Sequence, residues 1–128
     1  TARTETKPSA KKMQRWQRIV LNAAQQCEVR WLPKLHPVQD FADMPPRLAD
    51  YDLALVGSLY EDTRPLREAP LENVSRVALL IGPEGDFTRE EVEAAVGAGA
   101  LPVSFGERIL RTETAAILGL SVLSCRLL

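Results

Sequence analysis

Three short and largely apolar segments constrain the fold more than any other feature of this sequence. They are Leu53–Val56, Val74–Ile81 and Leu101–Phe105. Short apolar runs of this kind are typical of parallel strands that are buried on both faces. A helical pattern separates the second segment from the third, and another follows the third. The sequence therefore predicts an α/β fold whose sheet is parallel at least in part.

The region before the first apolar segment predicts one long helix and little else. Apolar residues recur there at three- and four-residue steps, which predicts an amphipathic helix from Ser9, as N-cap, to about Gln26. Val29–Leu32 is predicted to be a short strand and Pro37–Phe41 to start a short helical turn. Asp43–Arg47, which contains a Pro-Pro pair, is predicted to be a loop.

Two glycine-containing loops follow the second and third apolar segments. The turn Gly82–Gly85 leads into a helix, and Thr88 and Glu91 are predicted to form a capping box at its start. Because ligands bind at the carboxyl ends of parallel strands, the two loops indicate a binding site. Neither loop has the spacing of a dinucleotide fingerprint or a P-loop, so the residues alone predict a nucleotide-like ligand of undefined kind.

The remaining segments are less informative about chemistry. Gly57–Asn73 is polar and punctuated by proline, which predicts at most a short helix. The last helix, capped by Thr112 or Thr114 and running to about Leu127, is apolar on nearly every side. A terminal helix of this kind is often buried against a partner subunit, so we expect a homodimer.

Length and composition limit the class of protein. The chain has 128 residues, the size of one domain, and its 45% hydrophobic and 26% charged residues exclude disorder and low complexity. The longest apolar run, Val77–Ile81, is far too short to span a membrane, and no signal peptide is visible. Cys27 and Cys125 form no metal motif and no disulfide framework. We therefore expect a cytoplasmic protein with free thiols and no metal.

Charge is distributed unevenly along the chain. Residues 1–18 contain six basic side chains and one acidic one, whereas residues 19–128 contain ten basic and sixteen acidic ones. A basic segment on an acidic body is found in proteins that bind nucleic acid, because phosphate contacts supply much of the attraction. A solvated helix face that keeps the protein soluble is the alternative, and this feature taken alone favours it.

Both glycine-containing loops resemble the signature loops of a known enzyme family. The first runs Leu80-Ile81-Gly82-Pro83-Glu84-Gly85 with Phe87, and the second runs from Phe105-Gly106 through Arg108-Ile109-Leu110-Arg111-Thr112-Glu113-Thr114-Ala115. They are similar to those of the small-subunit ribosomal RNA (uracil-N3) methyltransferases, members of the SPOUT superfamily of knotted methyltransferases. The resemblance extends upstream, through Arg3-Thr4 and Arg15-Trp16.

This resemblance implies a parallel sheet flanked by helices with a C-terminal deep trefoil knot of the SPOUT type. It implies that residues 1–128 are the catalytic, C-terminal domain, and that the RNA-binding barrel found N-terminal to it in the family is absent from this chain. The implied partners are small-subunit ribosomal RNA, in ribosome biogenesis, and a second copy of the chain. The implied cofactor is S-adenosyl-L-methionine, with a third ligand loop near Val56-Gly57-Ser58. The implied cofactor-binding residues are Val56, Leu80, Ile81, Gly82, Pro83, Glu84, Gly85, Phe105, Gly106, Arg108, Ile109, Leu110, Thr112, Thr114 and Ala115.

Methylation of uracil N3 requires loss of the imide proton, which places negative charge on the uracil oxygens. A guanidinium can stabilise that charge, so Arg111 is the first catalytic candidate and Arg3 the second. Glu84 is a candidate for orienting the base. A salt bridge between Arg111 and Glu113, and a purely structural turn at Glu84, remain alternatives.

Two other functions remain open. A knotted ribose 2′-O methyltransferase uses the same fold and cofactor. A non-catalytic module for RNA binding or ribosome assembly would keep the fold without the activity.

Overall fold

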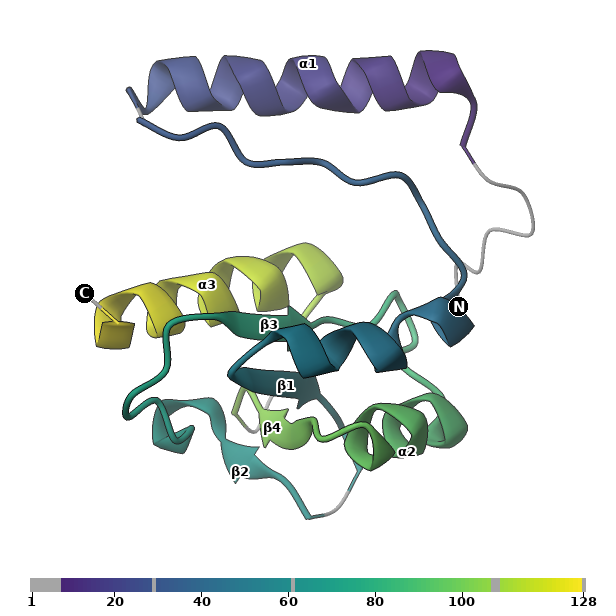
Figure 1. Cartoon of the computed structure of the whole chain (residues 1–128), viewed down its shortest axis with the longest axis vertical. Helices are drawn as coiled ribbons and strands as arrows, with labels where there is room; N and C mark the ends of the chain where they lie inside the picture. Colours follow the sequence, from purple (N-terminus) through teal and green to yellow (C-terminus); the bar gives the residue numbers. More distant parts are fainter. Residues whose placement is uncertain (1–7, 29, 61, 107–108, 128) are drawn as a thin grey trace. The chain divides into compact units, whose positions relative to one another are not determined.

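The computed structural model describes residues 8–28, 30–60, 62–106 and 109–127 (Figure 1). Contacts between Cα atoms divide these residues into two compact units, one that ends at Asp40 and one that begins at Phe41. The second unit contains the whole sheet and both glycine-containing loops. The two units are therefore described separately.

The first unit consists of the helix α1 (Ala10–Gln26) and the segment that follows it. The hydroxyl of Ser9 accepts a hydrogen bond from the Lys12 N–H at 3.2 Å, which confirms the predicted N-cap. The side-chain amide of Gln17 donates to the Leu35 carbonyl at 3.3 Å, so the following segment returns beside the helix.

The strand predicted at Val29–Leu32 is wrong over residues 30–32, because Arg30 and Trp31 lie in a bend and Leu32 has no regular secondary structure. Val29 lies outside the described residues. Pro33 and Pro37 each lack a backbone donor, which disfavours a paired strand here. The predicted helical turn at Pro37–Phe41 starts later, because the first helical turn, η1, spans Phe41–Asp43.

The second unit is built on a parallel four-stranded sheet with the order β2-β4-β1-β3 (Figure 1). The strands are β1 (Leu53–Gly57), β2 (Arg64–Pro65), β3 (Val77–Leu80) and β4 (Leu101–Ser104). Val56 of β1 is in register with Leu80 of β3 on one side and with Pro102 of β4 on the other. The three predicted strands and their parallel pairing are confirmed, so the domain is an α/β fold.

Alternation along β1 directs its side chains into two hydrophobic clusters, one on each face of the sheet. Ala54 and Val56 pack in a cluster with residues of the 3-10 helix η2 (Pro45–Asp50) and of α2 (Arg89–Gly97). Leu53 and Leu55 pack on the other face with residues of η3 (Leu66–Glu68) and of α3 (Thr112–Leu127). Helices therefore flank both faces of the sheet.

Two predictions about the connecting segments are wrong. Asp43–Arg47 is not a loop, because Pro45 and Pro46 start the helix η2, where the fixed φ of proline suits the first turn. Gly57–Asn73 holds the strand β2 as well as the short helix η3. With only two residues, β2 carries no recognisable apolar pattern.

Local hydrogen bonds stabilise the ends of the elements. Thr88 and Glu91 form the predicted capping box at the start of α2, with hydrogen bonds of 3.2 and 2.9 Å. At the amino ends of β1 and β3, the Asp52 carboxylate accepts hydrogen bonds from the backbone N–H groups of Arg76 and Ser75, each at 2.9 Å. These hydrogen bonds lower the Asp52 pKa. This contribution to stability is present above the unfolded pKa and is lost as the pH falls through the lowered value.

None of the described helices is long and apolar enough to cross a membrane.

Candidate functional site

A cavity of about 640 Å³ opens at the carboxyl ends of β1, β3 and β4. Three loops and the first turn of α3 form its wall. We call the three loops the β1 loop (Gly57–Tyr60), the β3 loop (Ile81–Phe87) and the β4 loop (Phe105–Arg111). The described lining residues are Gly57, Ser58, Leu59, Ile81, Gly82, Pro83, Glu84, Gly85, Asp86, Ser104, Phe105, Gly106, Ile109, Leu110, Arg111, Thr112 and Ala115.

Most residues predicted to bind a cofactor lie in this lining. They are Ile81, Gly82, Pro83, Glu84, Gly85, Phe105, Gly106, Ile109, Leu110, Thr112 and Ala115. The catalytic candidates Arg111 and Glu84 lie there too. The structure thus brings both signature loops to one cavity.

Other predicted site residues lie elsewhere. Val56 belongs to the core and is only 1% exposed, and Leu80 packs against the same cluster. Thr114 is exposed on α3 and is not among the described lining residues. Arg3 and Arg108 lie outside the described residues. On β1, the cavity wall therefore begins at Gly57, the residue that follows Val56.

Three lining residues were not predicted from the sequence: Leu59, Asp86 and Ser104. Ser104 ends β4, and Leu59 follows β1 by two residues. The signal that identifies them is positional, because residues at the ends of adjacent parallel strands share one edge of the sheet.

The β3 loop folds back on itself at Gly82. The Asp86 N–H donates to the Pro83 carbonyl at 2.8 Å, and the Asp86 carboxylate accepts from the Phe87 N–H at 2.8 Å. A Cβ on Gly82 would lie 2.6 Å from that carboxylate and 2.8 Å from the Phe87 nitrogen. Close approach of the chain, rather than a positive φ, therefore requires glycine at this position.

Thr112 connects the chain after β4 to the β3 loop. Its hydroxyl donates to the Gly82 carbonyl at 2.9 Å, a contact between residues thirty positions apart. Thr112 was predicted as a possible N-cap of the last helix. Instead it is the first helical residue, and its hydroxyl proton is directed to the other loop.

The chemistry of the wall is mixed. Ile81, Phe105 and Leu110 supply apolar surface, and the backbone at the glycines supplies hydrogen-bond donors and acceptors. Glu84, Asp86 and Arg111 are the charged side chains among the described lining residues. Such a wall suits a ligand with a flat ring and several polar groups.

Neither a salt bridge nor a metal site accounts for these charged side chains in the described part of the chain. Within the described residues, Arg111 forms no ion pair with Glu113, so the salt-bridge alternative is not realised. The described part of the chain also has no group of three or more His, Cys, Asp or Glu side chains arranged to hold a metal ion. Arg111 is exposed at the cavity and available to a ligand.

Comparison with known proteins defines the class. The family of RNA methyltransferase domains matches residues 1–124, and the chain belongs to this family. The ribosomal RNA small subunit methyltransferase E of Synechocystis sp. is 35% identical over 130 residues, which cover 99% of this chain and 43% of the relative. The protein of the same name from Bacillus subtilis is 32% identical and covers 94% of this chain and 49% of the relative.

Solved structures agree with this assignment. A Legionella pneumophila protein in complex with the bound cofactor SAM has a TM-score of 0.83 and 40% identity, covering 98% of this chain and 52% of that one. The ribosomal RNA small subunit methyltransferase E of Neisseria gonorrhoeae, bound to S-adenosyl methionine, has a TM-score of 0.77 and 28% identity, covering 91% and 48%. The chain thus spans about half the length of the relatives it matches.

Replacing Gly82 with alanine should destabilise the protein, because the new methyl group would displace the Phe87 backbone. We expect a loss of about 1–3 kcal/mol in the free energy of unfolding, measured by urea denaturation. Gly97→Ala is the matched control, since a Cβ at the end of α2 meets nothing within 4 Å. It should be neutral or add about 0.4–1 kcal/mol. Equal stability of Gly82→Ala and wild type would contradict the close approach.

Proposed function

We propose that this protein transfers a methyl group from S-adenosylmethionine to N3 of a uridine in small-subunit ribosomal RNA. The observation that carries the proposal is the cavity at three adjacent strand ends, which contains both signature loops. Support comes from two relatives of known structure that hold this cofactor and match more than nine-tenths of the chain.

The residues of the cavity fit the proposed cofactor. Ile81 and Leu110 offer apolar surface to the adenine ring, and neighbouring peptide groups offer hydrogen bonds to its edge. Gly85 and Gly106, with φ values of 85° and 118°, adopt backbone conformations in which peptide groups can face a ligand. When bound, the cofactor supplies a methyl carbon attached to a positively charged sulfur.

The proposed reaction is a displacement at that methyl carbon. Uracil N3 would lose its proton to solvent water and form a bond to the methyl carbon, while the bond from carbon to sulfur breaks and its electron pair remains on sulfur. Arg111 stabilises the negative charge on the uracil oxygens, and Arg3 is the second candidate for this role. Glu84, exposed in the β3 loop, orients the base. Placement of the reactants in line supplies much of the rate.

We also propose that residues 1–128 form a SPOUT methyltransferase domain, the catalytic C-terminal part of a longer architecture, and that the protein acts in the cytoplasm. The proposed trefoil knot would involve the chain after β3. The hydrogen bond from Thr112 to Gly82 places the chain after β4 beside the β3 loop, as such a knot would require.

A homodimer is proposed from the outward face of α3. Ile117 and Leu120 are 68% and 61% exposed in the described chain, whereas Leu123 is buried against the sheet. The apolar surface available to a second copy is therefore narrower than the sequence indicates. Ile117→Glu with Leu120→Glu should shift the protein from dimer to monomer in sedimentation velocity. A double variant that still sediments as a dimer would exclude this face.

The full-length protein tests the proposed function. Isothermal titration should give saturable heat with S-adenosylmethionine. Incubation with unmodified small-subunit ribosomal RNA, followed by nucleoside mass spectrometry, should yield 3-methyluridine. A 2′-O-methylated nucleoside would favour the ribose methyltransferase instead. Cofactor-free RNA binding without transfer would favour the non-catalytic module.

Arg111→Ala should separate chemistry from binding. Single-turnover methyl transfer should fall by about a hundredfold or more, because the charge on uracil loses its partner, while cofactor and RNA still bind. Arg111→Lys should recover part of the rate. If Arg111→Ala weakens cofactor binding and leaves single-turnover transfer intact, Arg111 belongs to ligand binding.

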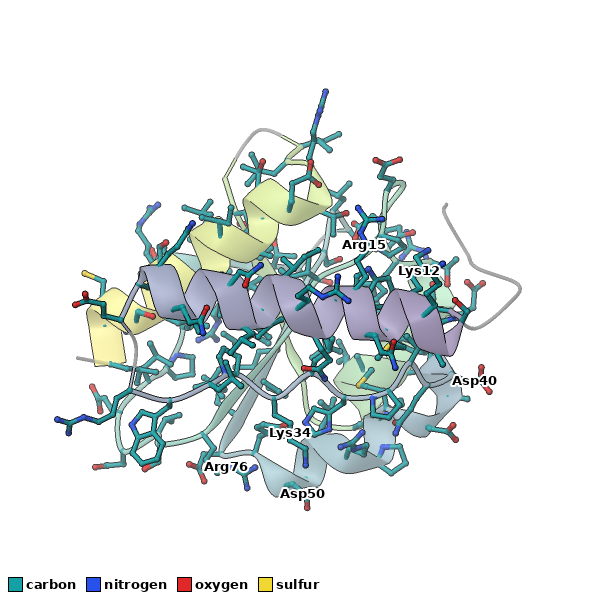
Figure 2. The ribbon with its side chains drawn as sticks, turned by 90° about the horizontal axis from the view of Figure 1, so that it is seen from above. Lys12, Arg15, Lys34, Asp40, Asp50 and Arg76 are labelled. Atoms are coloured by element: carbon teal, nitrogen blue, oxygen red, sulfur yellow. The ribbon has the colours of Figure 1, made fainter. Side chains whose placement is uncertain are left out.

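Substitutions on the basic face of α1 should instead affect RNA binding. Lys11, Arg15 and Arg18 recur at four- and three-residue steps, so they share one side of a helix that has no acidic residue. Figure 2 shows the side chains of Lys12 and Arg15 projecting from this helix. Lys11→Glu with Arg15→Glu should weaken RNA binding and reduce its salt dependence without changing cofactor affinity. Unchanged RNA affinity would remove α1 from the interface.

A further inference from the structure

Tyr60 is not among the described residues that line the cavity, yet it joins two of the loops that do. It lies at the end of the β1 loop, directly after the lining residue Leu59. Its hydroxyl donates a hydrogen bond to the carbonyl of Phe87 at 3.2 Å, across twenty-seven positions of sequence. Phe87 ends the β3 loop. One side chain therefore connects the β1 loop to the β3 loop.

The acceptor has no competing helical partner. Thr88 is the N-cap of α2, and its own carbonyl accepts the first helical hydrogen bond, from Val92. The carbonyl of Phe87 precedes that cap, so α2 offers it no donor. The hydroxyl of Tyr60 supplies one.

The ring of Tyr60 is held in place on several sides. It packs against the hydrophobic cluster that contains Val56 and Phe87, and the guanidinium of Arg89 lies 4.6 Å from its centroid. At its backbone, the Tyr60 N–H donates to the hydroxyl of the buried Ser58 at 3.0 Å. The position of the hydroxyl relative to Phe87 is therefore determined by packing.

We infer that Tyr60 is a positioning residue that holds the β1 loop against the β3 loop and so sets the shape of the cofactor cavity. The inference rests on the proposed function, because it concerns the same site. Thr112 performs the equivalent task on the other side, where its hydroxyl donates to Gly82. The β3 loop is thus hydrogen-bonded to the start of α3 near its beginning and to the β1 loop at its end.

The substitution Tyr60→Phe tests this role, because it removes the hydroxyl and keeps the ring beneath Arg89. Without the hydrogen bond to Phe87, the two loops lose their connection. The conformation that binds the cofactor must then be selected from a wider set of loop conformations. We expect the Kd for S-adenosylmethionine to rise about three- to tenfold in isothermal titration. The KM for this cofactor should rise by the same factor, while kcat at saturation and RNA affinity stay unchanged.

Tyr51→Phe is the matched control. The guanidinium of Arg76 lies 5.0 Å from the Tyr51 ring centroid, and the same group donates to the Asp50 carbonyl at 3.0 Å. Arg76 and Asp50 are labelled in Figure 2. Tyr51 precedes β1, so this pair lies at the amino end of the strand, away from the cavity. The same chemical change should therefore leave the Kd for S-adenosylmethionine unchanged.

The outcomes separate the inference from the proposed function. Wild-type affinity in a folded Tyr60→Phe protein would overturn the positioning role, as would an equal loss of affinity in Tyr51→Phe. A wild-type protein that gives no saturable heat with S-adenosylmethionine would overturn the proposed function, and the positioning role with it. A selective loss in Tyr60→Phe supports the positioning role and the cofactor site on which it rests.

Discussion

The burial of β1 between two parallel neighbours is the constraint on which the rest of the structure depends. Every residue of this strand is buried, and Leu55 and Val56 are almost completely removed from water. Because β3 and β4 pair with β1 in the same direction, all three strands end at one edge. The loops that follow them therefore meet at this edge, and the cavity forms where they meet.

The cavity depends on close contacts within and between these loops. The β3 loop turns so tightly that a side chain at Gly82 would collide with the Phe87 backbone. Hydroxyl groups of Tyr60 and Thr112 then donate to carbonyls at the two ends of this loop. Each of these bonds joins segments about thirty residues apart, so contacts within the chain hold the wall of the site in place.

The proposed division of labour follows from where the charges lie. Basic side chains gather in α1, which belongs to the first unit, whereas the cavity of the second unit contains two carboxylates and one guanidinium among its described residues. In the proposed function, attraction of RNA phosphates and recognition of a small cofactor would thus use different residues. Arg111 is the cation among the described lining residues, and the proposed reaction would develop charge on the base beside it.

Local sequence patterns determined the helix caps and two of the strands. The Ser9 cap, the capping box of Thr88 and the apolar runs of β1 and β3 act within a few residues, so the sequence alone predicts them. Tertiary structure decided what depends on distant partners. It placed Val56 in the core rather than in the site, formed β2 by pairing with β4, and turned the hydroxyl of Thr112 from a helix cap to Gly82. A hydrogen bond or strand pairing between remote segments leaves no periodic signal in sequence, because its geometry exists only after the sheet has assembled.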